Sequence, residues 1–266
     1  MIVKPKKHLG QHFLNDKTVS QRLALALEDS GFSFDKVLEV GPGMGALTDF
    51  LLKSTNFQTH VIEIDRESVK YLKENYPQLE GKIYEKDFLN TDLKTIVGDQ
   101  SFAIAGNFPY NISTEILFTV LDYKDQIPVV VGMFQKEVAE RIAEPPGSKK
   151  YGITSVLLQA FYDIEYLFTV LPEVFTPPPK VDSGVIRLKR NATKKLDCNE
   201  VHFKKVVKMA FNQRRKTLRN SLKAMINEYN FPFHEHEELF SKRPERLSVA
   251  DFVHLTQLFE AHSVIK

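Results

Sequence analysis

Cysteine is almost missing from this 266-residue chain, which contains Cys198 and no other cysteine. A single cysteine excludes an internal disulfide, so we expect a reducing, cytoplasmic environment. Long apolar runs are missing too, and no stretch reaches the roughly 20 apolar residues that a membrane span needs. The basic first ten residues contain no apolar segment, so we expect neither a secretory signal nor membrane association.

The net charge is also small, at +2, but it is distributed unevenly. Residues 1–190 contain 22 Lys and Arg against 25 Asp and Glu, whereas residues 191–266 contain 14 against 9. Between Phe203 and Lys223 there are eight basic residues and no acidic one. Because a solvated helix face normally mixes both signs, we interpret this basic segment as a surface for a polyanion.

Short apolar or β-branched runs alternate with helical periodicity through the first two-thirds of the chain, which predicts βα units and a parallel sheet. The predicted strands are 36–40, 59–64, 82–85, 102–105, 129–134, 164–170 and 184–188. The predicted helices among them are 46–53, 67–75, 114–121 and 136–142. Because little except a proline tract separates the last two strands, we expect the parallel sheet to end in an antiparallel pair.

The strand signal ends after Arg190, and helices are predicted at 201–211, 217–228 and 248–261. We therefore predict an α/β protein with two domains. The first covers residues 1–190 and the second, a small helical domain, covers residues 191–266.

A glycine-rich segment, Glu39-Val40-Gly41-Pro42-Gly43-Met44-Gly45, follows the first predicted strand. Glycine lets the backbone turn sharply and approach a ligand closely. Glu63 ends the next strand, where a carboxylate can accept both hydroxyls of a ribose, and Asp87 follows the third strand, where it can accept from an adenine amine. The pattern predicts a nucleoside cofactor. Because the same glycines with Ala46 fit the dinucleotide fingerprint, the loop alone does not separate a methyltransferase from a dehydrogenase.

The fourth predicted strand ends in Asn107-Phe108-Pro109-Tyr110, beside the crevice of a doubly wound sheet. An adenine amine is a poor nucleophile because its lone pair is delocalised into the ring. The Asn107 side-chain oxygen and the Pro109 carbonyl can each accept one amine hydrogen, which turns the lone pair toward a methyl donor. Tyr110 can stack on the base. A plain Asn-x-Pro turn is the alternative, but the preceding glycine loop and acids favour methyl transfer to a planar nitrogen.

These motifs resemble those of the KsgA family of small-subunit rRNA adenine dimethyltransferases, and the similarity extends over essentially the whole chain. Lys7-x-Leu9-Gly10-Gln11-His12-Phe13-Leu14 is similar to the amino-terminal cofactor motif of that family. Phe175-x-Pro177-x-Pro179-x-Val181-x-Ser183 is similar to a later motif. The family often has Asn at the position of His12 and Leu at that of Phe108.

The resemblance implies a Rossmann-like class I methyltransferase core that uses S-adenosylmethionine, releases S-adenosylhomocysteine and needs no metal. It implies cofactor contacts from Gln11, His12, Leu14, Gly41, Gly43, Glu63, Asp87, Phe88 and Asn107. It also implies a monomer that adds four methyl groups to two adjacent adenines near the 3′ end of 16S rRNA, during small-subunit maturation. The partner would be this rRNA or a precursor particle.

Two alternatives to this function are an adenine methyltransferase of the large subunit, of the macrolide-resistance type, and an assembly factor that acts mainly by binding. The first shares the core motifs, but Arg214-Arg215-Lys216 is similar to the small-subunit family. The intact Asn107–Tyr110 motif argues against a purely non-catalytic protein.

Three other segments are candidate sites. The tract Phe175–Lys180 is expected to be stiff, because proline fixes its own φ, and it could present Phe175 as the second face of an aromatic clamp on a flipped base. A rigid linker with a buried Phe is the alternative. Arg214, Arg215, Lys216 and Arg219 are expected to contact phosphates while apolar neighbours pack. The acidic run His234–Glu238 lacks a complete metal-ligand set, so we expect a solvated helix start there.

Overall fold

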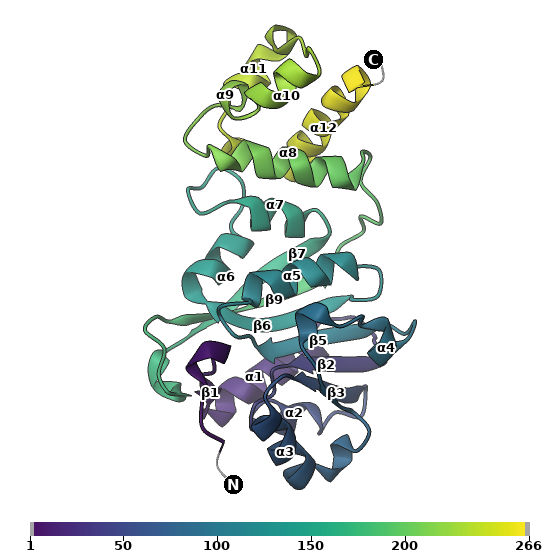
Figure 1. Ribbon diagram of the computed structural model, residues 1–266, viewed down its shortest axis with the longest axis vertical. Coiled ribbons are helices and arrows are strands. Elements are labelled where there is room, and N and C mark those ends of the chain that lie inside the picture. The colour runs from purple at the N-terminus through teal and green to yellow at the C-terminus, as the bar shows by residue number, and fades with distance from the viewer. Residues whose placement is uncertain (1–2, 264–266) are drawn as a thin grey trace. The chain divides into compact units, whose positions relative to one another are not determined.

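The structure is a computed structural model that describes residues 3–263, and it contains the alternating strands and helices expected of an α/β protein (Figure 1). The strands are β1 Phe13–Leu14, β2 Lys36–Val40, β3 Gln58–Glu63, β4 Ile83–Glu85, β5 Phe102–Asn107, β6 Val129–Gln135, β7 Tyr162–Val170, β8 Phe175–Thr176 and β9 Ser183–Arg190. The α-helices are α1 Lys17–Glu28, α2 Thr48–Leu51, α3 Arg66–Asn75, α4 Lys94–Val97, α5 Ser113–Asp122, α6 Lys136–Ala143, α7 Ile153–Gln159, α8 Glu200–Asn212, α9 Leu218–Ser221, α10 Lys223–Glu228, α11 Glu237–Ser241 and α12 Val249–Ser263. Short 3-10 helices are η1 Lys7–Leu9, η2 Pro77–Leu79, η3 Phe88–Asn90, η4 Pro172–Val174, η5 Phe233–His236 and η6 Pro244–Arg246.

Seven strands form the main sheet in the order β4-β3-β2-β5-β6-β9-β7. The pairs from β4 to β6 are parallel, and β9 is antiparallel to β6. This topology confirms the predicted α/β class. The chain runs outward from β2 to β4 on one side and then from β5 to β6 on the other. The strand order therefore reverses between β2 and β5, and a ligand crevice is expected there, at the carboxyl ends of the strands.

The central strands read as continuous apolar runs because they are buried on both faces. Residues 102–106 of β5 and 129–134 of β6 are all buried. Helix α1 packs on β5, β6 and β9, where Leu23 and Leu27 join the core. This helix is not among the predicted ones, although Asp16 caps its start by accepting hydrogen bonds from the Thr18 and Val19 amides.

Two further differences from the predicted elements concern helices. The helix expected over 217–228 is two helices, α9 and α10, with Leu222 between them. The structure also contains α7, which the sequence interpretation did not identify. Within residues 3–263, no helix combines the length and the apolar character needed to cross a bilayer.

The contacts between residues fall into two groups, which divide the chain into two compact units. The first consists of residues up to Glu140 together with Asp163–Arg190, and the second of Arg141–Tyr162 together with the residues from Asn191 onward. One division falls at the predicted boundary near residue 190. However, Arg141–Tyr162 belongs with the later helices, because its helix α7 packs on α8 and α12. The roles that we assigned to the two domains stay predictions.

A second, two-stranded sheet joins the amino-terminal segment to the proline tract. Strand β1 pairs antiparallel with β8, so that Phe13 lies opposite Thr176 and Leu14 opposite Phe175. These segments are more than 150 residues apart in the sequence, and no local pattern predicts that they pair. The pairing brings the first and last of the recognised motifs together in the first unit.

Candidate active site

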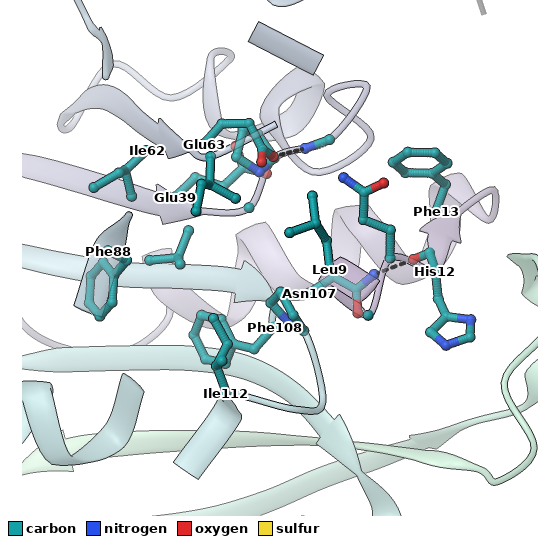
Figure 2. Close-up of a pocket in the computed structure, with 18 of the residues that line it drawn as sticks. Leu9, His12, Phe13, Glu39, Ile62, Glu63, Phe88, Asn107, Phe108 and Ile112 are labelled. Carbon is teal, nitrogen blue, oxygen red and sulfur yellow. Dashed lines mark hydrogen bonds between the residues drawn. The ribbon is translucent and has the colours of Figure 1, made fainter. Parts of the chain in front are cut away.

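The carboxyl ends of β2, β3, β4 and β5 surround a pocket of about 370 Å³ (Figure 2). This volume falls within the range of small-molecule sites, and it lies at the expected reversal of strand order. Among the catalytic and cofactor residues predicted from the sequence, all except Phe175 line it. They are Gln11, His12, Leu14, Gly41, Gly43, Glu63, Asp87, Phe88, Asn107, Pro109 and Tyr110. Their individual roles stay predictions.

The glycine loop between β2 and α2 is held close to the amino-terminal segment. Gly43 has a φ of 56°, and a Cβ atom added there would lie 2.8 Å from Cε1 of Phe13. Any larger residue would therefore be strained and would displace the Phe13 ring. On the other side, the Tyr76 hydroxyl lies 3.2 Å from the carbonyl oxygens of Met44 and Gly45 and donates to them. These contacts fix the loop, and because Gly43 has no side chain, none enters the pocket at this position.

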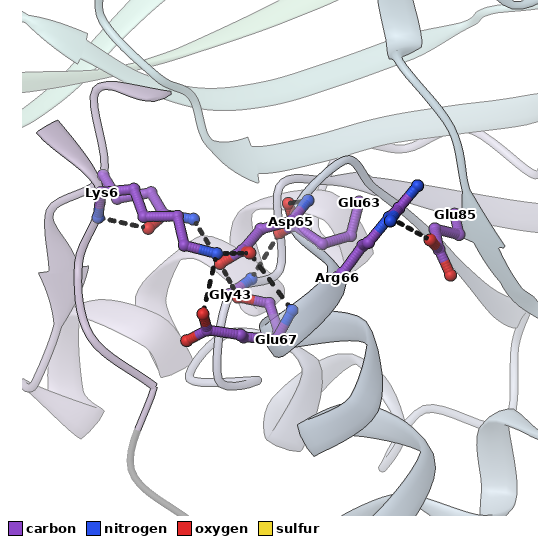
Figure 3. A network of polar contacts seen from close by, with 9 residues as sticks. Lys6, Gly43, Glu63, Asp65, Arg66, Glu67 and Glu85 are labelled. Atoms are coloured by element: carbon purple, nitrogen blue, oxygen red, sulfur yellow. Dashed lines mark hydrogen bonds and ion pairs between the residues drawn. The ribbon is translucent and has the colours of Figure 1, made fainter. Parts of the chain in front are cut away.

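Glu63 ends β3, and its carboxylate contacts the glycine loop at Gly43 (Figure 3). Its Oε2 accepts from the Gly43 amide at 3.1 Å, and its Oε1 accepts from the Asp65 amide at 2.9 Å. Burial raises the pKa of Glu63, while these backbone hydrogen bonds act in the opposite direction. Each carboxylate oxygen can accept more than one hydrogen bond, so both remain able to accept from the hydroxyls of a ribose.

A second buried carboxyl, Glu39, lies one strand away. It is 1% exposed, and its Oε2 accepts from the Thr48 hydroxyl at 2.6 Å. Burial raises the pKa of Glu39 to about 8. At neutral pH this side chain is therefore mainly protonated, so it places little negative charge in the pocket. Its position two residues before the Gly41-Pro42-Gly43 turn is the signal that could have identified it in the sequence.

A polar network ties the amino-terminal segment to the end of β3 (Figure 3). The Lys6 ammonium donates to Asp65 and lies 3.3 Å from a Glu67 oxygen, while Gln11 Nε2 donates to Asp65 at 3.1 Å. Although burial alone would raise the pKa of Asp65, the hydrogen bonds from Lys6, Gln11 and Ser68 lower it overall. Asp65 therefore stays ionised and anchors the segment. The sequence gives no local signal for this contact, because Lys6 and Asp65 are 59 residues apart.

Asp87 and Phe88 form the adjoining part of the pocket. The Asp87 carboxylate caps η3 by accepting from the Leu89 amide at 3.0 Å, and it also accepts from Asn90 Nδ2 at 2.6 Å. Phe88 follows as a buried apolar wall, together with Ile62. A carboxylate beside apolar surface suits a purine ring, because the ring packs on the walls and its amine donates to the acid.

Asn107 lies at the end of β5, and its amide has a defined orientation. Nδ2 donates to the His12 carbonyl at 2.8 Å (Figure 2). The hydrogen bond therefore fixes Oδ1 as the free acceptor of the amide, and none of the described residues donates to it. The predicted acceptor is available on a side chain that is already held in place.

Pro109 and Tyr110 complete the turn that follows Asn107. The Pro109 carbonyl accepts from the Ile112 amide at 3.1 Å, which leaves one lone pair of this oxygen for a second donor. The Tyr110 hydroxyl lies 2.6 Å from the Ser183 hydroxyl. Burial raises the pKa of Tyr110, so the phenol remains neutral at physiological pH. The turn thus presents one carbonyl acceptor beside an aromatic ring.

Phe175 does not occupy the position expected of a clamp residue. It is 2% exposed and packs in the apolar core with Leu14 and Val174. The pairing of β1 with β8 turns its side chain into this core, since Leu14 lies directly opposite. The structure therefore supports the alternative stated above, a rigid segment with a buried Phe, and we do not propose Phe175 as a catalytic residue.

The four basic residues that were predicted to bind RNA differ in their surroundings within the second unit. Arg214 is half-buried, and its Nη2 donates to the Tyr151 carbonyl at 3.1 Å. Arg215, Lys216 and Arg219 are exposed, and none of them forms an ion pair with a described acid. Arg214 consequently has a structural contact that the other three lack. Residues 3–263 contain no group of three or more His, Cys, Asp or Glu side chains suited to a metal.

The family model and the similar proteins all indicate the same family. Residues 2–259 match the family model described as ribosomal RNA adenine dimethylase. The chain is 60% identical to the ribosomal RNA small subunit methyltransferase A of Cytophaga hutchinsonii, over 96% of this chain and 97% of that one. It is 55% identical to the protein of the same name from Parabacteroides distasonis, over 98% and 96%.

Solved structures show the same fold. A dimethyladenosine transferase from Plasmodium falciparum superposes with a TM-score of 0.79 at 26% identity, covering 95% of this chain and 98% of that one. The 23S rRNA methyltransferase ErmE superposes with a TM-score of 0.67 at 23% identity, covering 93% and 99%. The large-subunit enzyme thus shares the fold, whereas the relatives that are more than half identical carry the small-subunit name.

Proposed function

Because the chain belongs to the ribosomal RNA adenine dimethylase family, we propose that it transfers methyl groups from S-adenosylmethionine to the exocyclic amine of adenines in small-subunit rRNA. The observation that carries the proposal is the held amide of Asn107: its Nδ2 donates to the His12 carbonyl, which leaves Oδ1 as an acceptor on a residue that lines the pocket together with Pro109. Two adjacent adenines near the 3′ end of 16S rRNA are the proposed targets, and a maturing small subunit in the cytoplasm is the proposed setting.

The pocket suits the proposed cofactor on several grounds. The Glu63 carboxylate can accept from the ribose hydroxyls, and Asp87 can accept from the adenine amine between the apolar walls of Ile62 and Phe88. The tight turn at Gly43 leaves room for the rest of the cofactor to pass close to the backbone. When bound, S-adenosylmethionine supplies a methyl group on a positively charged sulfur.

The residues at the end of β5 prepare the other reactant. Asn107 Oδ1 and the Pro109 carbonyl each accept one hydrogen of the adenine amine, so the nitrogen is pulled toward a tetrahedral geometry and its lone pair is less delocalised into the ring. Tyr110 holds the base by stacking, and orientation of this kind supplies much of the reduction of an activation barrier. Transfer of the methyl group leaves the amine cationic, and it then loses one proton to the solvent. One hydrogen remains on the nitrogen, and either acceptor can still hold it. The same arrangement can therefore serve both additions.

The proposed substrate can be tested directly with purified protein and labelled S-adenosylmethionine. We expect faster methylation of a small-subunit precursor particle than of a short unstructured oligonucleotide containing adenines. Folded RNA can engage basic residues in both units, whereas a short strand cannot. Equal rates on the two RNAs would contradict a structured particle as the substrate.

The exposed cations that follow α8 give a second test. Replacing Arg215, Lys216 and Arg219 together with Ala should weaken RNA binding and flatten its salt dependence. Each lost phosphate contact should reduce the log–log slope by about 0.7–0.9. The affinity for S-adenosylmethionine should stay unchanged, because its proposed site belongs to the first unit.

Two comparison variants separate phosphate binding from a structural role. Replacing the exposed Lys194 and Lys195 with Ala removes positive charge elsewhere in the second unit and should leave the slope unchanged. Arg214→Ala should lower the melting temperature, because it removes the contact with the Tyr151 carbonyl. An unchanged slope in the triple variant, or an equal fall in the Lys194 and Lys195 variant, would contradict the assigned RNA surface.

A further inference from the structure

The His12 side chain lies against Tyr110. The two rings are stacked, with centroids 5.6 Å apart and planes inclined by 28°. Figure 2 shows the His12 ring extending beyond Asn107, away from the Glu39 and Glu63 carboxylates. The ring is therefore directed toward the residues proposed to receive the base, and away from those proposed to bind the ribose of the cofactor.

The His12 ring is held by the proline tract. Its Nδ1 lies 2.7 Å from the Pro177 carbonyl and donates to it. This contact continues the β1–β8 pairing by one residue beyond Phe13 and Thr176. A carbonyl oxygen has no proton to give, so Nδ1 must carry the hydrogen of this bond.

The backbone of His12 is fixed as well. Pro177 has no N–H to offer to the His12 carbonyl, and this carbonyl accepts instead from Asn107 Nδ2 at 2.8 Å. One residue thus links three motifs that lie far apart in the sequence. Its carbonyl orients the Asn107 amide and its ring covers part of Tyr110.

Ser183 holds Tyr110 from a different direction. Its hydroxyl, at the start of β9, lies 2.6 Å from the Tyr110 hydroxyl and limits rotation of the phenol ring. Ser183 is itself fully buried, so this contact is shielded from water. The ring is then restrained by a stacking neighbour on its face and by a hydrogen bond at its tip.

We propose that His12 is a positioning residue for the target base, which acts with Ser183 to fix the Tyr110 ring before the adenine arrives. The inference rests on the proposed function and deepens it, because it assigns the His12 side chain to the substrate half of the site, in place of the cofactor contact that the family resemblance implies. An ordered ring costs less conformational entropy when the base stacks on it. With His12 on one face of Tyr110, the adenine is received on the opposite face.

The alternative is that the His12 ring is a movable plug, which occupies the position of the base on Tyr110 until the base arrives. The contacts oppose it. Displacing the His12 ring would break its hydrogen bond to Pro177 and its stacking on Tyr110. A ring anchored in this way is suited to support Tyr110, whereas a plug must leave at low cost.

A double-mutant cycle on His12 and Tyr110 tests the proposal. The variants are His12→Ala, Tyr110→Leu and their combination, with the exposed His8→Ala as a matched control. The measurements are kcat/KM for the small-subunit particle and S-adenosylmethionine affinity by calorimetry. His12→Ala should lower kcat/KM about 3- to 10-fold, as expected for an aromatic pair, while cofactor affinity stays within about twofold of the wild type. The double variant should be no slower than Tyr110→Leu.

Several results would overturn the proposal. The losses of kcat/KM caused by His12→Ala and Tyr110→Leu could multiply in the double variant. His12→Ala could weaken cofactor binding as much as it slows methylation. His12→Ala could also raise kcat/KM, as removal of a plug would. Tyr110→Phe and Ser183→Ala provide a second, milder cycle that keeps the ring, and their combination should be no slower than the slower single variant. A wild-type protein that is inactive on the particle while binding the cofactor would instead contradict the proposed function itself.

Discussion

Asn107→Ala is expected to abolish methyl transfer while leaving RNA binding largely intact. The substitution removes the oxygen that accepts an amine hydrogen, and losing one such preorganised group typically costs about 10²- to 10³-fold in kcat. It also removes the hydrogen bond to the His12 carbonyl, so a modest loss of S-adenosylmethionine affinity is expected too. Single-turnover methylation of the small-subunit particle, measured beside RNA binding, checks both expectations.

Asn107→Asp is the matched variant, because it keeps an acceptor oxygen and loses the donor to His12. It should retain more activity than Asn107→Ala if the acceptor is what matters for chemistry. Near-normal turnover of Asn107→Ala would contradict the mechanism. Equal loss in both variants would mean that the contact with His12, and not the acceptor, is the essential feature.

Gly132→Ala is expected to give the second large effect, through packing beneath the Asn107–Tyr110 turn. Gly132 lies on β6 opposite Gly106 of β5, and the Phe108 ring fills the space that these two glycines leave. A Cβ atom added to Gly132 would overlap the ring, placing Cδ2 of Phe108 only 2.8 Å away. Overpacking of this kind costs about 1–3 kcal/mol, and it would shift the turn that carries the acceptors. We expect a lower melting temperature and a large loss of methylation.

Phe108→Leu provides the rescue for this variant. Leucine lacks the outer ring atoms, so Phe108→Leu combined with Gly132→Ala should recover both stability and methylation. Phe108→Leu alone is the control. It should remain active, because the family that the sequence motifs resemble often has Leu at the position of Phe108. A fully active Gly132→Ala protein, or a combination as impaired as Gly132→Ala, would show that the ring does not set the position of the turn.

Much of the site could be predicted from the sequence because the carboxyl ends of parallel strands lie at one edge of a sheet. Gly41, Glu63, Asp87 and Asn107 each follow or end a short apolar run, so assigning the strands also placed these residues together. The sheet, with its antiparallel strand after the proline tract, was predicted for the same reason. The strands can be assigned from the local periodicity of the sequence, and the positions of these residues follow from the strands.

The remaining features depend on contacts between distant segments. His12 and Pro177 are 165 residues apart, and Arg214 and Tyr151 are 63 apart. The pairing of β1 with β8 turns Phe175 into the core, whereas its sequence context favoured a ring exposed to the base. Tertiary partners of this kind leave no trace in the spacing of a single sequence.

The most direct test of the central claim is a map of methylated adenines in small-subunit rRNA from cells with and without this protein. The rRNA should lose dimethyladenine near its 3′ end when the protein is missing. Wild-type protein should restore the modification, and Asn107→Ala protein should not, although it still binds the RNA. Unchanged adenine methylation without the protein, or full restoration by Asn107→Ala, would contradict the account.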